Sequence, residues 1–190
     1  MKNSKITFPP KTCTGCGVCS ASCPRKCIQM KQNAEGFLFP EIQANLCIKC
    51  DICKNICPLY SADHSLEFTF PSLFAAYHKD IMHRRQSTSG GAFAAIAEEV
   101  IARGGVVFGS AFNDTACTSV ICRTATTEEE LSALKKSKYI QSDSSHVYAE
   151  IDKILHQGRI VLFPGPHAKW LAFAHFLRRI LYKSSFIPVI

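Results

Sequence analysis

The chain has 190 residues, 47% of them apolar and 19% charged, which is typical of a globular protein and excludes a disordered one. Its formal net charge is +7, but the basic residues are dispersed and not clustered with aromatic residues, so we do not expect nucleic acid as a partner. No apolar stretch reaches the roughly 18 residues of a membrane span, so no span is expected.

The cysteines are concentrated in one part of the chain. Residues 1–11 lack the apolar core of a signal peptide, which predicts a cytoplasmic protein whose thiols stay reduced. Nine of the 11 cysteines lie between Cys13 and Cys57. Cysteines in this number and compartment indicate metal or redox chemistry rather than disulfide bonds.

Two cysteine runs repeat one spacing. The first comprises Cys13, Cys16, Cys19 and Cys23 before Pro24, and the second comprises Cys47, Cys50, Cys53 and Cys57 before Pro58. Both fit C-x2-C-x2-C-x3-C-P, the spacing of bacterial ferredoxins in which the fourth cysteine ligates the other cluster. The sequence therefore predicts two 4Fe–4S clusters, one held by Cys13, Cys16, Cys19 and Cys57 and the other by Cys47, Cys50, Cys53 and Cys23.

Zinc is the alternative occupant of these cysteines. Zinc sites take four ligands as two spaced pairs, and triple runs would leave thiolates unused, so clusters are favoured. Lysines flank the runs at positions 11, 49 and 54, where they would steer an acidic redox partner or simply be solvated. Three cysteines outside the pattern are predicted to be packing residues: Cys27, Cys117 and Cys122.

A polar segment at residues 61–65 follows the cysteine-rich region, and Pro71 comes shortly after. We place a ferredoxin domain at residues 1–65 and a partial α/β domain at 72–163. In the latter, apolar periodicity predicts helices over 93–101 and 147–155, and a capping box at 127–130 starts a helix through residue 136. Apolar runs predict strands at 106–108, 120–121 and 160–163. The predicted fold class is α+β, a ferredoxin-like two-cluster module followed by a truncated α/β domain.

Two polar motifs stand beside the predicted helices of this second region. Residues 87–91, Ser-Thr-Ser-Gly-Gly, precede a helix, where free backbone N–H groups favour an anion such as a phosphate, or where a serine simply caps the helix. Residues 137–141, Ser-Lys-Tyr-Ile-Gln, follow another helix. They would hydrogen-bond a ligand or finish a polar turn.

With residues 104–109 and 161–163, these motifs give the chain from Phe74 onward a resemblance to a known family. It resembles the N-terminal domain of the coenzyme F-420 hydrogenase/dehydrogenase β-subunit family. The resemblance implies a subunit that passes electrons between iron–sulfur clusters, FAD and an acceptor such as a deazaflavin. It implies a redox partner protein and a further oxidoreductase subunit. It also implies that the flavin contacts Ser87, Ser89, Gly90, Gly91, Ser137, Lys138, Tyr139 and Gln141.

The resemblance stops after Phe163. There the family has a Gly-Thr-Pro-Cys-Gln motif, whereas this chain reads Pro164-Gly165-Pro166-His167. Codons can be chosen for residues 164–172 so that reading from the third base restores the motif, and we therefore predict a frameshifted tail at residues 164–190. The alternative takes the tail as written, with Trp170 and Leu177 on one face of an amphipathic helix.

Two functions follow from the sequence. In the first, the chain is an iron–sulfur electron-transfer protein whose α/β region is a truncated remnant of the β-subunit type. In the second, it is an active flavin-dependent oxidoreductase subunit. No catalytic residue is predicted for either.

Overall fold

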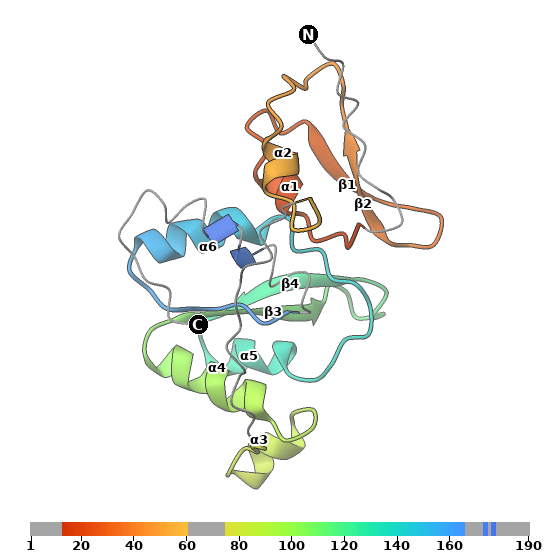
Figure 1. Ribbon diagram of the computed structural model, residues 1–190. Helices are drawn as coiled ribbons and strands as arrows, with labels where there is room; N and C mark the ends of the chain where they lie inside the picture. The colour runs from red at the N-terminus through yellow and green to blue at the C-terminus, as the bar shows by residue number, and fades with distance from the viewer. Residues whose placement is uncertain (1–12, 61–74, 166–172, 175, 178–190) are drawn as a thin grey trace. The chain divides into compact units, whose positions relative to one another are not determined.

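The computed structural model describes residues 13–60, 75–165, 173–174 and 176–177, and the structural statements below concern these residues (Figure 1). The chain divides into two compact units. The first comprises Met1–His64, Asp143–Tyr148 and Gly165–Phe186, and the second comprises Ser65–Ser142, Ala149–Pro164 and Ile187–Ile190. The domain limits predicted at residues 65 and 72 lie outside the described residues.

The first unit consists of two one-turn helices and a β-hairpin. Helix α1 spans Val18–Ala21 and helix α2 spans Ile52–Asn55. Strands β1 (Ile28–Gln32) and β2 (Leu38–Ile42) pair antiparallel. The third cysteine of each run lies in one of the two helices, so the helices position the cysteine runs.

Local turn chemistry closes the hairpin, which is not among the elements predicted from the sequence. The Asn33 side-chain oxygen accepts hydrogen bonds from the backbone N–H groups of Glu35 (3.1 Å) and Phe37 (2.8 Å). Gly36 has a φ of 84°, which glycine adopts without steric cost. An Asn at the start of a turn and a Gly near its end are the usual signals of such a connection.

The second unit contains a three-stranded mixed sheet in the order β4-β3-β5. Its elements are α3 (Ile81–Arg85), α4 (Ala92–Ala102), β3 (Val106–Phe112), β4 (Val120–Ala125), α5 (Glu128–Leu134), α6 (Val147–His156, of which Val147 and Tyr148 belong to the first unit) and β5 (Val161–Leu162). Strand β3 pairs antiparallel with β4 and parallel with β5. The chain therefore has the predicted α+β character.

Helices α4 and α5 cover one face of this sheet (Figure 1). They share one apolar core with strands β3 and β4, formed by Ala97, Val107, Ala111, Ala125, Leu131 and Leu134. The core uses small residues at the helix–sheet contact. Gly109 in β3 is one of them, because a Cβ there would lie 3.2 Å from the Leu134 side chain.

Most predicted elements of the second unit are confirmed. Helix α4, strands β3 and β4 and helix α6 lie where the periodicity predicted them. Helix α5 ends at Leu134, earlier than predicted, because Lys135 has extended backbone angles. Cys27 and Cys122 are buried as expected, but the packing role predicted for Cys117 is wrong, since that side chain is exposed.

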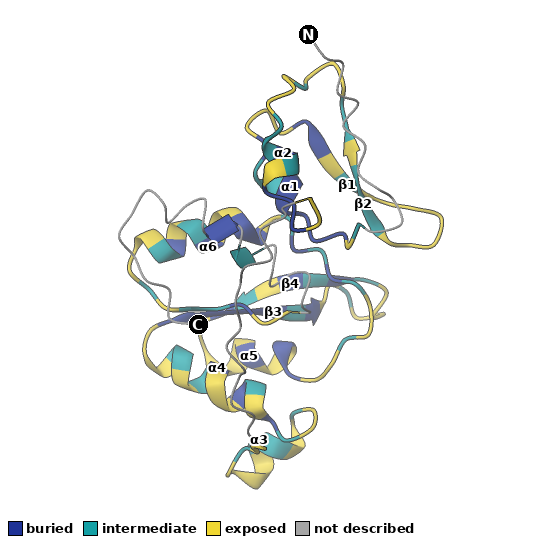
Figure 2. Cartoon of the chain, in the orientation of Figure 1, coloured by how far each residue is buried: buried dark blue, intermediate teal, exposed yellow. Residues whose placement is uncertain are grey.

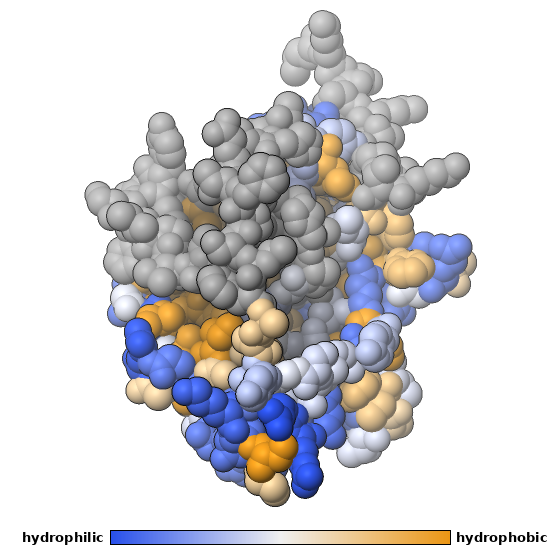
Figure 3. All heavy atoms as spheres, turned by 60° about the horizontal axis from the view of Figure 1, so that its bottom comes forward, coloured by the Kyte–Doolittle hydropathy of each residue, from blue (hydrophilic) through white to orange (hydrophobic). Residues whose placement is uncertain are grey.

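In the part of the chain that the structure describes, no helix is long and apolar enough to cross a membrane. Where the face in Figure 3 is coloured by hydropathy, hydrophilic and hydrophobic residues are intermixed. Tyr77, Ile81 and Met82 are exposed apolar residues in and just before α3.

Candidate metal centre

The first cysteine run forms a loop with two left-handed glycines. Gly15 has a φ of 63° and Gly17 a φ of 78°, and Gly17 directly precedes α1. The backbone N–H of Gly15 donates to the sulfur of Cys13. The loop encloses a hollow whose cysteines are Cys13, Cys16, Cys19 and Cys57.

The second run repeats this backbone without glycine. Lys49 has a φ of 55° and Asp51 a φ of 54°, at the positions of Gly15 and Gly17. The backbone N–H of Lys49 donates to the Cys47 sulfur at 3.4 Å. A second hollow is lined by five cysteines: Cys23, Cys27, Cys47, Cys50 and Cys53.

The fourth cysteine of each run therefore lines the hollow of the other run. Cys23 follows α1 and lines the second hollow, and Cys57 follows α2 and lines the first. One helical turn between the third and fourth cysteines turns the fourth side chain away from its own loop, and Pro24 and Pro58 follow each of them. The structure thus separates the two predicted ligand sets.

Burial makes these thiols difficult to ionise without a cation. Burial raises the pKa of Cys13, Cys16, Cys19 and Cys53. At Cys23 burial acts in the same direction, but hydrogen bonds from Cys27 and from the backbone of Arg25 and Lys26 outweigh it and lower the pKa. Several buried thiols around one hollow fit a thiophilic metal, whose charge stabilises the thiolates. The donor set therefore fits iron–sulfur clusters.

Residues from elsewhere in the first unit cover the first loop. The Tyr148 hydroxyl donates to the Cys16 carbonyl oxygen at 2.9 Å, and the Phe176 ring lies 5.1 Å from the Tyr148 ring. A Cβ on Gly17 would lie 2.8 Å from the Ser145 Cα atom. Cys16 is accordingly 8% exposed, whereas its counterpart Cys50 is exposed. In Figure 2, the neighbouring helix α1 is coloured buried and intermediate, whereas α2 also carries an exposed residue.

Cys27 is the one cysteine of this region that is not a predicted ligand. Its side chain is 2% exposed, and its sulfur lies 3.4 Å from that of Cys23. Burial, followed by the hydrogen bond with Cys23, raises the pKa of Cys27 to about 11. The thiol is therefore protonated and available as a weak donor to the Cys23 sulfur.

Comparison with known families identifies this part of the chain. Residues 12–61 match the family model of the 4Fe-4S dicluster domain. The chain thus carries a ferredoxin-type iron–sulfur domain near its N-terminus and is an iron–sulfur protein of electron transport. No curated protein matches the chain.

In the second unit, the loop at residues 87–91 is folded by its own contacts. Ser87 donates through its hydroxyl to the His83 carbonyl oxygen at 2.9 Å. Gly90 must be a glycine, because a Cβ would lie 2.6 Å from the Ala76 carbonyl oxygen. Gly91, and not a serine, is the N-cap of α4, so the simple serine-cap interpretation is wrong. Ser89 has a φ of 54°.

The structure brings the two polar motifs together. The backbone N–H of Ser137 donates to the Thr88 hydroxyl at 2.9 Å. Lys138 donates to the Ala133 and Lys135 carbonyl oxygens at 2.7 Å, so it caps the C-terminal end of α5. Tyr139 is 95% exposed, and Gln141 is half-buried. Residues 137–141 therefore finish a helix and contact the 87–91 loop.

A charge cluster beside these motifs had no signal in the sequence. Glu98 on α4 receives hydrogen bonds from His78 (2.9 Å) and His83 (2.7 Å), and Lys135 lies 3.2 Å from it. Burial acts to raise the pKa of Glu98, but these hydrogen bonds lower it to about 2. The hydrogen bond with Glu98 in turn raises the pKa of His83.

The same atoms would suit a metal only after rearrangement. The backbone N–H of Asp80 donates to Nδ1 of His78, so Nε2 of His78 carries the proton and donates to Glu98. A bound cation would need that proton removed and the Lys135 ammonium displaced. Among the described residues this is therefore an ion network that ties α3, α4 and the residue after α5 together.

Proposed function

We propose that the first unit binds two 4Fe–4S clusters with crossed ligands and serves as an electron-transfer module. The observation that carries this proposal is the separation of the cysteines between two hollows. One contains Cys13, Cys16, Cys19 and Cys57, and the other contains Cys47, Cys50, Cys53 and Cys23 together with Cys27. Bound clusters supply one-electron transfer.

The residues of this unit prepare the ligands for that role. The N–H groups of Gly15 and Lys49 donate to the first sulfur of each run, and such hydrogen bonds stabilise negative charge on sulfur. The apolar residues Val18 and Ile56 lie beside the ligands and limit the access of water. A lower local dielectric makes each of those hydrogen bonds stronger.

Metal analysis tests this proposal directly. We expect anaerobically purified protein to be brown, to contain equal amounts of iron and acid-labile sulfide, and to give a reduced-state paramagnetic spectrum of two interacting 4Fe–4S clusters. A colourless protein that contains zinc and no sulfide would refute it. A single 4Fe–4S cluster would refute the crossed ligand sets while leaving the iron–sulfur assignment intact.

We further propose, as a second function, a flavin-dependent oxidoreductase subunit of the coenzyme F-420 hydrogenase/dehydrogenase β type. The hydrogen bond between Thr88 and Ser137 favours it, since it joins the two motifs that the resemblance assigns to the flavin. On this proposal Ser87, Ser89, Gly90, Gly91, Ser137, Lys138, Tyr139 and Gln141 contact FAD. The partners are an acidic redox protein and a further subunit, in the cytoplasm.

Flavin content separates the two functions. Protein purified with added FAD is expected to retain flavin if the second function holds, and Thr88→Val is expected to reduce that content without changing the iron content. Clusters without flavin would leave the first function alone. The interpretation of residues 164–190 as a frameshifted tail stays a prediction, which resequencing the locus across the codons of residues 163–166 checks.

A further inference from the structure

The two cysteine loops differ in what surrounds them, although their backbones are alike. In the first loop, Cys16 is covered by Tyr148 and Phe176, and Gly17 lies against Ser145. In the second loop, the counterpart Cys50 is exposed. Of the eight predicted ligands, Cys50 is the only exposed one, so the second loop offers another protein the closer approach to a ligand.

The exposed loop has an apolar centre and a basic rim. Ile48 is 60% exposed and precedes Cys50 by two positions. Arg25 and Ile48 both line the second hollow, and Arg25 and Lys49 are exposed. The nearby carboxylate of Asp51 is paired with Lys54 at 3.2 Å, which leaves the rim positive. An apolar centre with a charged rim is the usual arrangement of a protein interface.

The backbone at Lys49 indicates that its charge is used. A left-handed conformation is strained for any residue with a Cβ, and the equivalent position in the first loop is the glycine Gly15. Glycine would make the same N–H hydrogen bond to Cys47 without that strain. The chain keeps this backbone strain at Lys49 although a glycine would relieve it. This indicates that the Lys49 side chain has a function.

We propose that residues Arg25, Ile48, Lys49 and Cys50, here called the Cys50 face, form the docking surface for an acidic redox protein. The proposal rests on the function proposed above, because a docking surface at a predicted ligand matters only if clusters are bound. It assigns the partner to the second loop and not to the first. The basic rim supplies the long-range attraction, and Ile48 supplies the apolar contact.

Binding of an acidic flavodoxin to the full chain tests the Cys50 face, with affinity measured anaerobically at low and high ionic strength. Lys49→Gln and Lys49→Gly are both expected to weaken binding about threefold to tenfold at low salt, and less at high salt, where the Debye length is short. Because glycine relieves the backbone strain, Lys49→Gly is also expected not to lower the melting temperature. If Lys49 served folding alone, its variants would instead have lower melting temperatures and wild-type affinity.

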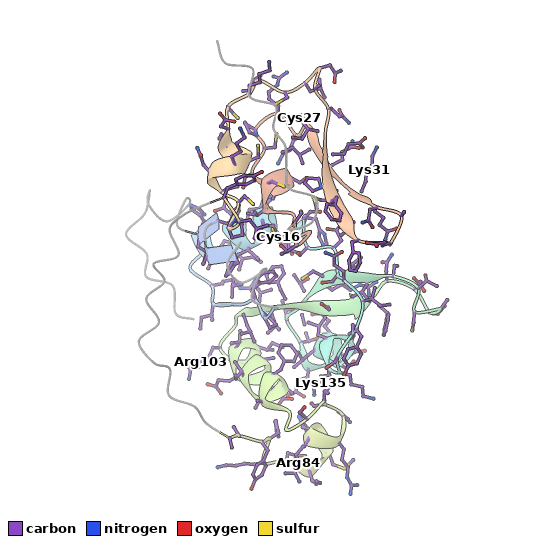
Figure 4. The ribbon with its side chains drawn as sticks, turned by 45° about the vertical axis from the view of Figure 1, so that its right-hand side comes forward. Cys16, Cys27, Lys31, Arg84, Arg103 and Lys135 are labelled. Atoms are coloured by element: carbon purple, nitrogen blue, oxygen red, sulfur yellow. The ribbon has the colours of Figure 1, made fainter. Side chains whose placement is uncertain are left out.

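Three controls make the result decisive. Lys31→Gln removes the same charge from β1 of the hairpin (Figure 4), where Lys31 pairs with Glu41, and is expected to leave affinity unchanged. Asp51→Gly frees Lys54 and is expected to tighten binding. A basic cytochrome c is expected not to bind.

Equal weakening by Lys49→Gln and Lys31→Gln would overturn the docking surface, and so would wild-type affinity in both Lys49 variants. Iron and sulfide are measured in every sample. If the wild-type chain lacks 4Fe–4S clusters, the proposed function fails and the docking surface fails with it. If clusters are present and the Lys49 variants still bind as wild type, only the docking surface fails.

Discussion

The two units of the molecule satisfy their buried titratable groups in opposite ways. In the second unit, the Glu98 carboxylate meets His78, His83 and Lys135, so its charge is balanced by the protein itself. In the first unit, one apolar cluster consists largely of thiols, namely Cys19, Cys23, Cys27 and Cys53. No described basic side chain is paired with any of these sulfurs.

From this difference we infer that the first unit, and not the second, needs a metal to fold. Thiolates crowded around a hollow repel one another, and burial opposes their ionisation further. A metal centre removes both costs, so its binding free energy becomes folding free energy of the first unit. The second unit has an apolar core between α4, α5 and the sheet, so we expect it to keep its fold when the metal is removed.

The largest expected effect is therefore loss of the first unit when its metal is removed. We expect Cys13→Ala or Cys47→Ala to lose iron and sulfide and to raise hydrogen exchange in β1, while β3 stays protected. Cys122→Ala in β4 is the matched control, since it also removes a buried thiol but is expected to keep full iron content. Unchanged iron in the Cys13 and Cys47 variants would contradict the ligand sets. If β3 lost as much hydrogen-exchange protection as β1, the inference that only the first unit needs the metal would be wrong.

Exchanging residues between the two loops tests the cover over the first one. Gly17→Asp places a Cβ 2.8 Å from the Ser145 Cα atom and strains a φ of 78°, so we expect it to cost about 3 kcal/mol of stability. The reciprocal Asp51→Gly is expected to change stability by less than about 1 kcal/mol, because it relieves strain but loses a partly exposed ion pair. Urea unfolding of the cluster-loaded protein measures both. Equal costs would show that the loops have equivalent surroundings.

The Glu98 network makes the stability of the second unit depend on pH in the acidic to neutral range. The pKa of Glu98 is lowered from 4.5 to about 2, so its stabilisation is present above about pH 4.5 and lost as the pH falls toward 2. The pKa of His83 is raised from 6.5, so its contribution is complete below pH 6.5 and lost as the pH rises through the raised value. The network therefore stabilises the unit most between about pH 4.5 and 6.5.

Substitution of Glu98 checks this window. Glu98→Gln is expected to cost about 2 kcal/mol and to flatten the pH profile, because it leaves the Lys135 ammonium buried beside a neutral group. Glu99→Gln, which removes an exposed carboxylate paired with Arg103, is the control and is expected to cost much less. Urea unfolding midpoints measure both variants, with the hydrogen-exchange protection of β3 as the signal, at several pH values between 4 and 8. A pH profile that Glu98→Gln leaves unchanged would contradict the assigned network.

The sequence predicted the elements whose signals are local. Apolar periodicity located α4 and α6, and Thr127 caps α5 through its hydroxyl as the capping box required. The return hydrogen bond of the box is shifted by one residue, because Glu130 accepts from the backbone N–H of Thr126. The two hollows separate the eight cysteines of the runs in the same way as the crossed ligand sets, with Cys27 added to the second hollow, and the ligand sets themselves stay a prediction.

Features that depend on contacts distant in sequence were not predictable. His78, Glu98 and Lys135 are separated by many residues, and no spacing rule connects them. Tyr148 lies far along the chain from Cys16, and nothing in either segment indicates their hydrogen bond. The different surroundings of the two cysteine loops follow from this contact. The difference in exposure between Cys16 and Cys50 was therefore not predictable from their similar sequence motifs either.

The smallest expected effect concerns that contact. Tyr148→Phe removes a hydroxyl donor and leaves the buried Cys16 carbonyl oxygen without it, so we expect a cost of about 1 kcal/mol, confined to the first unit. Iron release to a chelator is expected to become faster, because the first loop opens more often when its cover is weakened. Tyr139→Phe, at a fully exposed ring in the second unit, is expected to change neither quantity. If both variants release iron at the wild-type rate, the cover over the first loop contributes nothing to cluster retention.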